Sequence, residues 1–110
     1  MTASPPLTGT AGRPVGHEQS LTRPVLVLSA QPWLDCTPPV VTVIPLTRAR
    51  LESPTHVQVE PGDSGLRETS YITCEDVRAI SPLRLGRRFG RAGDDVVLRV
   101  EVILRRLLGL

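Results

Sequence analysis

Two apolar runs between residues 23 and 47 constrain the fold more than any other part of the chain. The first reads RPVLVLS from Arg23, and the second reads PPVVTVIPLT and ends at Thr47. Runs of Val, Ile and Leu that are bounded by Pro and polar residues are typical of buried β-strands. In an antiparallel pair, the start of the first strand lies beside the end of the second. We therefore predict that Arg23 and Thr47 meet at one edge of a sheet, which becomes the candidate site.

Shorter apolar and alternating segments between residues 55 and 91 predict further strands, separated by polar loops and turns. The segment 31–35 between the two runs reads as a polar loop, and residues 61–65 read as a turn. Residues 55–60 alternate strictly, which predicts a half-exposed strand with His56 on its solvated side. Residues 68–80 predict another strand, interrupted by two acids, and the basic segment 87–91 predicts a short edge strand whose charges guard that edge.

The last segment, residues 94–108, predicts an amphipathic helix. Its apolar side chains recur at helical spacing, its first residues are acidic and its last turn is basic, which complements the helix dipole. Gly109 then stands where helices commonly stop. Leu98 and Val102 fall outside the main apolar stripe, which leaves apolar surface for a partner subunit. The chain therefore predicts a mainly β domain with a C-terminal helix, and compact β-rich chains of this size usually form small barrels or sandwiches.

The positive charge of this chain at pH 7 comes from arginine alone. All 13 basic residues are arginine, and the formal net charge is only +2. Arginine suits phosphate groups better than lysine does, because its planar fork donates two parallel hydrogen bonds. Residues 77–93 carry five arginines and no acid. This run is either a solvated surface or a contact for an anion or nucleic acid. With one Phe, one Tyr and one Trp, the composition argues against a multi-ring platform for stacking bases.

Neither the cysteines nor the N-terminal residues indicate a further function. Cys36 and Cys74 lack a C-x-x-C spacing and a nearby His cluster, so we predict no metal site and no cofactor. We expect residues 1–15, rich in Pro, Gly, Thr and Ser, to be poorly ordered, and residues 16–110 to form the folded domain. No secretory signal or run of about 18 apolar residues is present. We therefore expect a cytoplasmic protein without a membrane segment.

Several motifs occur in an order that resembles one protein family. Gly16-His17-Glu18-Gln19 precedes RPVLVLS from Arg23, and Ile44-Pro45-Leu46-Thr47 follows. This series resembles the MazF/PemK family of toxin endoribonucleases, which shows a G-x-E-Q loop, an R-P-x-L-V-x-S strand and a P-L-T strand end. Residues 54–57, 66–70 and 104–108 also look like segments of that family. The resemblance covers about residues 14–110.

The resemblance implies an SH3-like small β-barrel with a C-terminal helix that works as a homodimer. Members of the family cut single-stranded RNA without a metal, and a cognate antitoxin protein neutralises them. Carried over by position, Arg23 and Thr47 match the catalytic pair, and Ser70 matches a serine in the same groove. The substrate-contacting loop of the family matches Gly16, His17, Glu18 and Gln19.

The residue types agree with RNA cleavage by the ribose 2′-hydroxyl, which yields a 2′,3′-cyclic phosphate and a free 5′-hydroxyl. Arg23 can bind the phosphoryl oxygens with a bidentate fork, and Thr47 can donate a hydrogen bond to the same group. An arginine is a poor general base, because its guanidinium group stays protonated in proteins. We therefore assign proton transfer to His17 or Glu18 as a hypothesis.

The sequence before Gly16 departs from the family pattern. The family has a hydrophobic first strand there, whereas MTASPPLTGTAGR shows no strand pattern. We therefore expect the usual first strand to be missing, which a start codon placed too late, a degenerate copy or a barrel closed differently would each explain. An unpaired sheet edge in an incomplete barrel would then make the protein less stable than a full-length relative. Two alternatives stay open: a catalytically degenerate MazF-like protein that binds RNA or antitoxin, and a simple RNA- or DNA-binding barrel.

Overall fold

The computed structural model describes residues 13–18 and 23–110, and within them the chain is mainly β with a long helix at its C-terminal end. The strands are β1 (Arg13–Glu18), β2 (Arg23–Val27), β3 (Val41–Thr47), β4 (His56–Val59), β5 (Ser70–Thr73), β6 (Arg78–Ile80) and β7 (Leu85–Ala92). The helices are α1 (Gln31–Asp35) and α2 (Asp94–Leu108), with 3₁₀ turns η1 (Cys74–Asp76) and η2 (Pro82–Arg84). The prediction of a mainly β fold with a C-terminal helix is confirmed.

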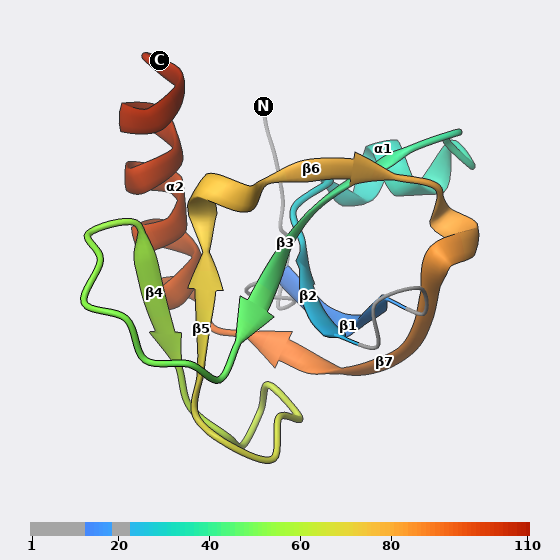
Figure 1. Ribbon diagram of the computed structural model, residues 1–110. Coiled ribbons are helices and arrows are strands. Elements are labelled where there is room, and N and C mark those ends of the chain that lie inside the picture. Colours follow the sequence, from blue (N-terminus) through green and yellow to red (C-terminus); the bar gives the residue numbers. More distant parts are fainter. Residues whose placement is uncertain (1–12, 19–22) are drawn as a thin grey trace.

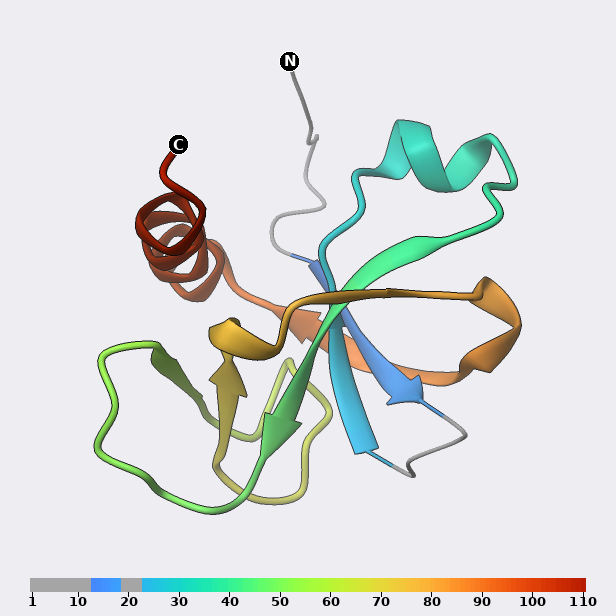
Figure 2. The same cartoon turned by 45° about the horizontal axis from the view of Figure 1, so that its top comes forward.

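Strand β3 lies at the centre of the sheet. The strands are antiparallel in the order β4-β5-β3-β2-β1-β7, and β6 also pairs with β3. The first residues of β3 pair with β6, whereas Leu46 and Thr47 pair with β5. Figure 1 and Figure 2 show β3 crossing the middle of the molecule, with β6 running over its start and β5 beside its end. The sheet bends around its interior and stays open, since β4 and β7 do not pair with each other in the described residues.

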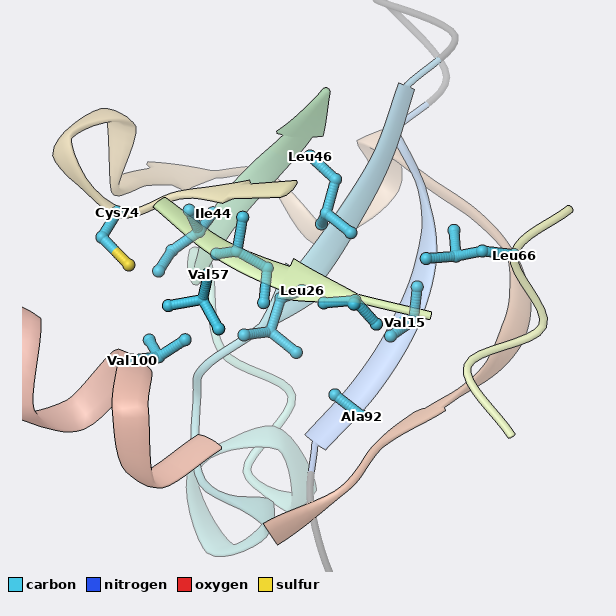
Figure 3. Packing of buried hydrophobic residues seen from close by; sticks show 11 residues of the cluster. Val15, Leu26, Ile44, Leu46, Val57, Leu66, Cys74, Ala92 and Val100 are labelled. Atoms are coloured by element: carbon cyan, nitrogen blue, oxygen red, sulfur yellow. The ribbon is translucent and has the colours of Figure 1, made fainter. Parts of the chain in front are cut away.

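Both faces of β2 and β3 are buried, which explains why both segments read as nearly continuous apolar runs. Leu26, Ile44 and Leu46 face the main core, together with Val57 of β4 and Val100 of α2 (Figure 3). The opposite face carries a smaller cluster that α1 and β7 help to cover through Leu34 and Leu85. Its members are Val25, Val27, Val41, Val43 and Ile80. Each such buried side chain contributes about 1.5–3 kcal/mol of hydrophobic stabilisation.

Helix α2 matches its prediction closely. It begins with Asp94, buries Val100 against the main core, and ends at Leu108. Gly109 follows, and its φ of 71° is the left-handed conformation that glycine adopts without strain. Leu98 and Val102 are 60% and 48% exposed, as their place outside the apolar stripe predicted. Leu107, which falls on that stripe, is nevertheless exposed. None of the described helices is long and apolar enough to cross a membrane.

The prediction that a strand is missing before residue 16 is wrong. Strand β1 begins at Arg13 and pairs with both β2 and β7. Gly16, His17 and Glu18, which were expected in a loop, therefore belong to β1, and Gln19 lies outside the described residues, as do residues 1–12. Since β2 has partners on both sides, no central edge is left open. The physical reason for expecting low stability is thereby removed.

The segment between β2 and β3 was expected to be a polar loop. Residues 31–35 form the short helix α1 rather than a loop, with Pro32 in its first turn, where proline costs no hydrogen bond. Trp33 Nε1 donates to the carbonyl of Val40 at 3.0 Å, which ties this helix to the start of β3.

His56 is not solvated, contrary to its place on the polar side of β4. Its side chain is 5% exposed, and its Nε2 lies 3.0 Å from Oε2 of Glu75 in η1. Thr55 Oγ1 donates to the other carboxylate oxygen at 2.6 Å. Partial burial opposes ionisation of Glu75, but the hydrogen bonds from Thr55 and His56 outweigh it and lower the pKa of the carboxyl. The turn η1 thus covers a histidine that the strand alone would expose.

Candidate active site

The pairing of β2 with β3 brings Arg23 and Thr47 together. The ladder between β2 and β3 ends with Val25 paired with Pro45, and Arg23 and Thr47 lie two residues beyond this pair, where both line the same cavity. Side chains two residues apart lie on the same face of a strand, and directly opposite residues have Cβ atoms about 5 Å apart. If the register continues, the arginine and the hydroxyl share one face, and both line one cavity at this edge of the sheet.

A cavity of about 560 Å³ opens at this edge, and we call it the groove. It is lined by Arg23, Pro24, Leu46, Thr47, Arg48, Ala49, Gly65, Leu66, Arg67, Glu68, Ser70, Arg87 and Phe89. Strands β2 and β3 form its floor, the segment before β5 forms one wall, and β7 forms another. Its charged lining consists of four arginines and a single glutamate. An anionic ligand is therefore favoured.

The two hydroxyl groups of the groove differ in what they can offer. Thr47 Oγ1 accepts a hydrogen bond from the backbone N–H of Ala49 at 3.1 Å, so its own proton remains available for a ligand. Ser70 is only 2% exposed, and its Oγ donates to the carbonyl of Glu68 at 3.1 Å. Thr47 can therefore donate a hydrogen bond to a ligand in the groove, whereas the Ser70 hydroxyl can only accept one.

Arg48 and Glu68 form an ion pair within the groove lining. It connects the residue after β3 to the segment before β5. The two side chains are 72% and 61% exposed, and exposed pairs contribute only about 0–1 kcal/mol. A phosphate in the groove would therefore compete with Glu68 for Arg48 at little energetic cost.

Two glycines hold the segment 61–69 against β7. A Cβ on Gly90 would lie 2.2 Å from the carbonyl oxygen of Asp63, and one on Gly65 would lie 2.1 Å from that of Phe89. Neither distance is possible for a real side chain. The backbone N–H of Arg91 donates to the carbonyl of Asp63 at 2.8 Å, which completes the contact. The wall of the groove thus depends on the absence of side chains at both positions.

The residues predicted to contact substrate from the N-terminal motif lie on β1, next to this wall. The ring centroid of His17 is 6.1 Å from that of Phe89, which lines the groove, although His17 is not itself among the lining residues. Gly16 is buried and pairs with Val25 on one side. The backbone of Glu18 pairs with that of Arg23. The last three residues of β1, 16–18, therefore lie beside strand β2 and the wall of the groove.

Sequence reasoning did not assign Arg48, Arg67, Arg87 or Phe89 to the site. Arg87 was noted only as part of the basic run 77–93, and Phe89 as part of an edge strand. For Arg48 the signal was its position directly after Thr47. For Arg87 and Phe89 no local signal exists, because the register of β7 against β1 brings them to the groove.

Comparisons with known proteins agree with this geometry. The family described as the PemK-like, MazF-like toxin of type II toxin–antitoxin systems matches residues 9–108. Endoribonuclease EndoA of Bacillus subtilis (strain 168) is 30% identical over 97 residues, which cover 87% of this chain and 84% of that protein.

Solved structures share the fold. The Mycobacterium tuberculosis toxin MazF-mt6 has a TM-score of 0.80 and 26% identity, and the match covers 89% of this chain and 98% of the toxin. A mycobacterial endoribonuclease in complex with its cognate antitoxin has a TM-score of 0.75 at 22% identity, with 94% of this chain and 97% of that chain covered. The second likeness concerns the fold alone.

Proposed function

The chain belongs to the PemK-like, MazF-like toxin family, and we propose that it is the toxin of a type II toxin–antitoxin system, an endoribonuclease that cleaves single-stranded RNA. The observation that carries the proposal is the placement of Arg23 and Thr47 in one groove whose charged lining is four arginines and one glutamate. Messenger RNA is the natural substrate of such an enzyme, which would act in the cytoplasm.

In the proposed reaction the 2′-hydroxyl of the substrate attacks the adjacent phosphorus. The bond from phosphorus to O5′ breaks, which leaves a 2′,3′-cyclic phosphate and a 5′-hydroxyl. Arg23 binds the non-bridging oxygens and offsets the charge that builds on them, while Thr47 donates its free O–H to the same group. Removing one donor of this kind typically costs about 10²–10³ in rate.

Two protons must move in this reaction, one from the 2′-hydroxyl and one to O5′. Arg23 is a poor base because a guanidinium group stays protonated in proteins. We assign the transfers to His17 or Glu18, which lie on the strand beside Arg23. The pH–rate profiles of His17→Ala and Glu18→Ala test this assignment. A profile that keeps the parent shape in both variants would contradict it.

The reaction as proposed needs no metal, because the nucleophile belongs to the substrate and arginines offset the developing charge. Cleavage should therefore persist undiminished in excess EDTA, and a requirement for added Mg²⁺ would refute this part of the proposal. Gly16, Gln19 and Ser70 are proposed to contact the RNA around the cleaved bond.

We propose two protein partners, a second copy of the chain and an antitoxin. The exposed Leu98 and Val102 of α2 border another cavity, of about 520 Å³, between α2 and β4. Apolar atoms form most of the lining of this cavity, which suits a contact between subunits. The basic groove suits an acidic antitoxin segment that would exclude RNA. Loss of cleavage on addition of the cognate antitoxin tests the second assignment.

Mapping of 5′ ends after incubation of the purified protein with a long RNA tests the central proposal. Arg23→Ala should reduce the cleavage rate by about 100-fold or more. Thr47→Val should reduce it by about 10-fold or more. Arg106→Ala, on the exposed side of α2, is the matched control and should cleave like the parent.

A parent protein that binds RNA without cutting it would favour the degenerate binding protein instead. That alternative rested on a missing first strand, and β1 removes this reason for it.

A further inference from the structure

The chain's single phenylalanine lies in the wall of the groove with two cationic or aromatic neighbours. Phe89 lines the cavity that also contains Arg23 and Thr47. The guanidinium carbon of Arg87 lies 5.5 Å from its ring centroid, and the His17 ring lies at 6.1 Å with an interplanar angle of 41°. Strands β1 and β7 thus bring together a phenyl ring, an imidazole ring and a guanidinium group from residues far apart in the sequence.

A β-bulge places Phe89 at this position. On β1, Val15 and Gly16 are adjacent, but their partners on β7 are Gly90 and Arg88. Phe89 is therefore the extra residue between two paired positions. Bulges re-aim side chains and recur beside active sites, because the extra residue escapes the regular alternation of the strand.

The backbone of Phe89 is further fixed from outside the sheet. Gly65 lies so close that a Cβ there would be 2.1 Å from the Phe89 carbonyl oxygen. The side chain is half-buried, with one part against the main core and one part in the groove. The ring is thus held in place before any ligand arrives, which lowers the entropic cost of stacking on it.

Aromatic rings and arginine planes are the groups on which proteins stack unpaired bases. Resting on the proposed ribonuclease function, we propose that Phe89, together with Arg87, forms a stacking subsite for one unpaired base of the RNA beside the cleaved bond. A purely structural role would explain the contact with the core but not why the ring also lines a basic cavity. The scarcity of aromatic residues excludes a platform for several bases, and one ring suffices for one base.

Binding measurements test this subsite with a readout other than cleavage. The probe is an RNA oligonucleotide with the mapped cleavage sequence and a 2′-deoxy sugar at the cleaved position, made complete and with single abasic positions. Phe89→Leu should bind the complete RNA about 5- to 100-fold more weakly than the parent, which is the usual loss when a stacked base loses its ring. Phe89→Tyr retains the ring and should bind within about twofold of the parent.

The abasic series separates stacking from a general loss of structure. At one abasic position, parent and Phe89→Leu should bind equally well, because neither can stack there. Val96→Ala, which thins the core away from the groove, is the control and should leave affinity unchanged. Equal affinity of parent and Phe89→Leu for the complete RNA, or an equal deficit of the variant at every abasic position, would overturn the subsite.

The proposed function can fail independently of this inference. A parent that cleaves RNA while Phe89→Leu binds normally refutes only the subsite. If the parent cleaves no RNA, affinity is compared between a random single-stranded RNA pool and a ribose-phosphate oligomer without bases. Equal affinity for both would overturn the subsite, whereas a preference for the bases that Phe89→Leu loses would support it without the nuclease.

Discussion

Substituting Gly90 by alanine should detach one wall of the groove from the sheet. The new Cβ would lie 2.2 Å from the Asp63 carbonyl oxygen and 2.6 Å from the Ser64 carbonyl carbon. Both neighbours are backbone atoms, so a side-chain rotation cannot relieve the clash. The segment 61–69 must therefore move by about 1 Å or more, to restore ordinary contact distances of about 3.5–4 Å.

The cost of this movement follows from the contacts that hold the segment. The hydrogen bond from the Arg91 N–H to the Asp63 carbonyl would be lost, which costs about 1 kcal/mol. Leu66, now buried in the main core, would lose part of a burial contribution of about 1.5–3 kcal/mol. The free energy of unfolding should fall by about 2–3 kcal/mol in total, which lowers the Tm by about 10 °C.

Urea unfolding at fixed protein concentration measures this change, and Gly16→Ala is the matched control on the paired strand. A Cβ on Gly16 would lie 3.4 Å from the nearest atom, the Arg87 carbonyl oxygen, so that variant should stay within about 1 kcal/mol of the parent. A Gly90→Ala protein with an unchanged free energy of unfolding would refute the argument that two missing side chains hold the wall.

Three further predictions address charge, the buried thiol and the helix surface. Glu68→Gln frees Arg48 for phosphate and should raise the affinity for non-cleavable RNA a few-fold. The control is Glu101→Gln, which breaks an exposed ion pair on α2 and should leave the affinity unchanged. Equal effects of the two substitutions would contradict a specific role of the Arg48–Glu68 pair in the groove. Burial raises the pKa of the Cys74 thiol to about 11. The protonated thiol should therefore favour the folded state below about pH 9, and this contribution, on the order of 2 kcal/mol, should be lost as the pH rises towards 11. Thermal unfolding between pH 8 and 11 should show a decline that Cys74→Ala reduces, and a decline of equal size in both proteins would count against it. Leu98→Ser combined with Val102→Ser should convert a dimer to a monomer in analytical ultracentrifugation, with the exposed Leu83→Ser as control, and an unchanged mass would place the subunit contact elsewhere.

The proximity of Arg23 and Thr47 was predictable because it follows from neighbouring segments of the chain. Strands β2 and β3 are joined by residues 28–40 and both are buried on two faces, so their runs of Val, Ile and Leu identify them. Antiparallel pairing then places Arg23 beside Thr47 without further information. Helix α2 was predictable for the same reason, since its pattern of charges and apolar residues is local.

Strand β1 could not be recognised because its sequence, RPVGHE, contains one proline, one glycine and a single core residue, Val15. Its conformation depends on hydrogen bonds with β2 and β7 rather than on propensity. His56 was misjudged for a related reason. The strand pattern puts it on the polar side, but Glu75 from η1 lies over it.

The assembly of the groove from near and distant segments has a consequence for how the protein folds. Arg23 and Thr47 come together through the β2–β3 hairpin, whereas the wall with Phe89 requires Val15 to find Gly90 across most of the chain. Closing a longer loop costs more entropy, and local contacts form faster. We expect pulse-labelled hydrogen exchange to protect β3 amides before those shared by β1 and β7. A newly synthesised chain would then bring Arg23 and Thr47 together early and gain a complete groove only at the last step of folding.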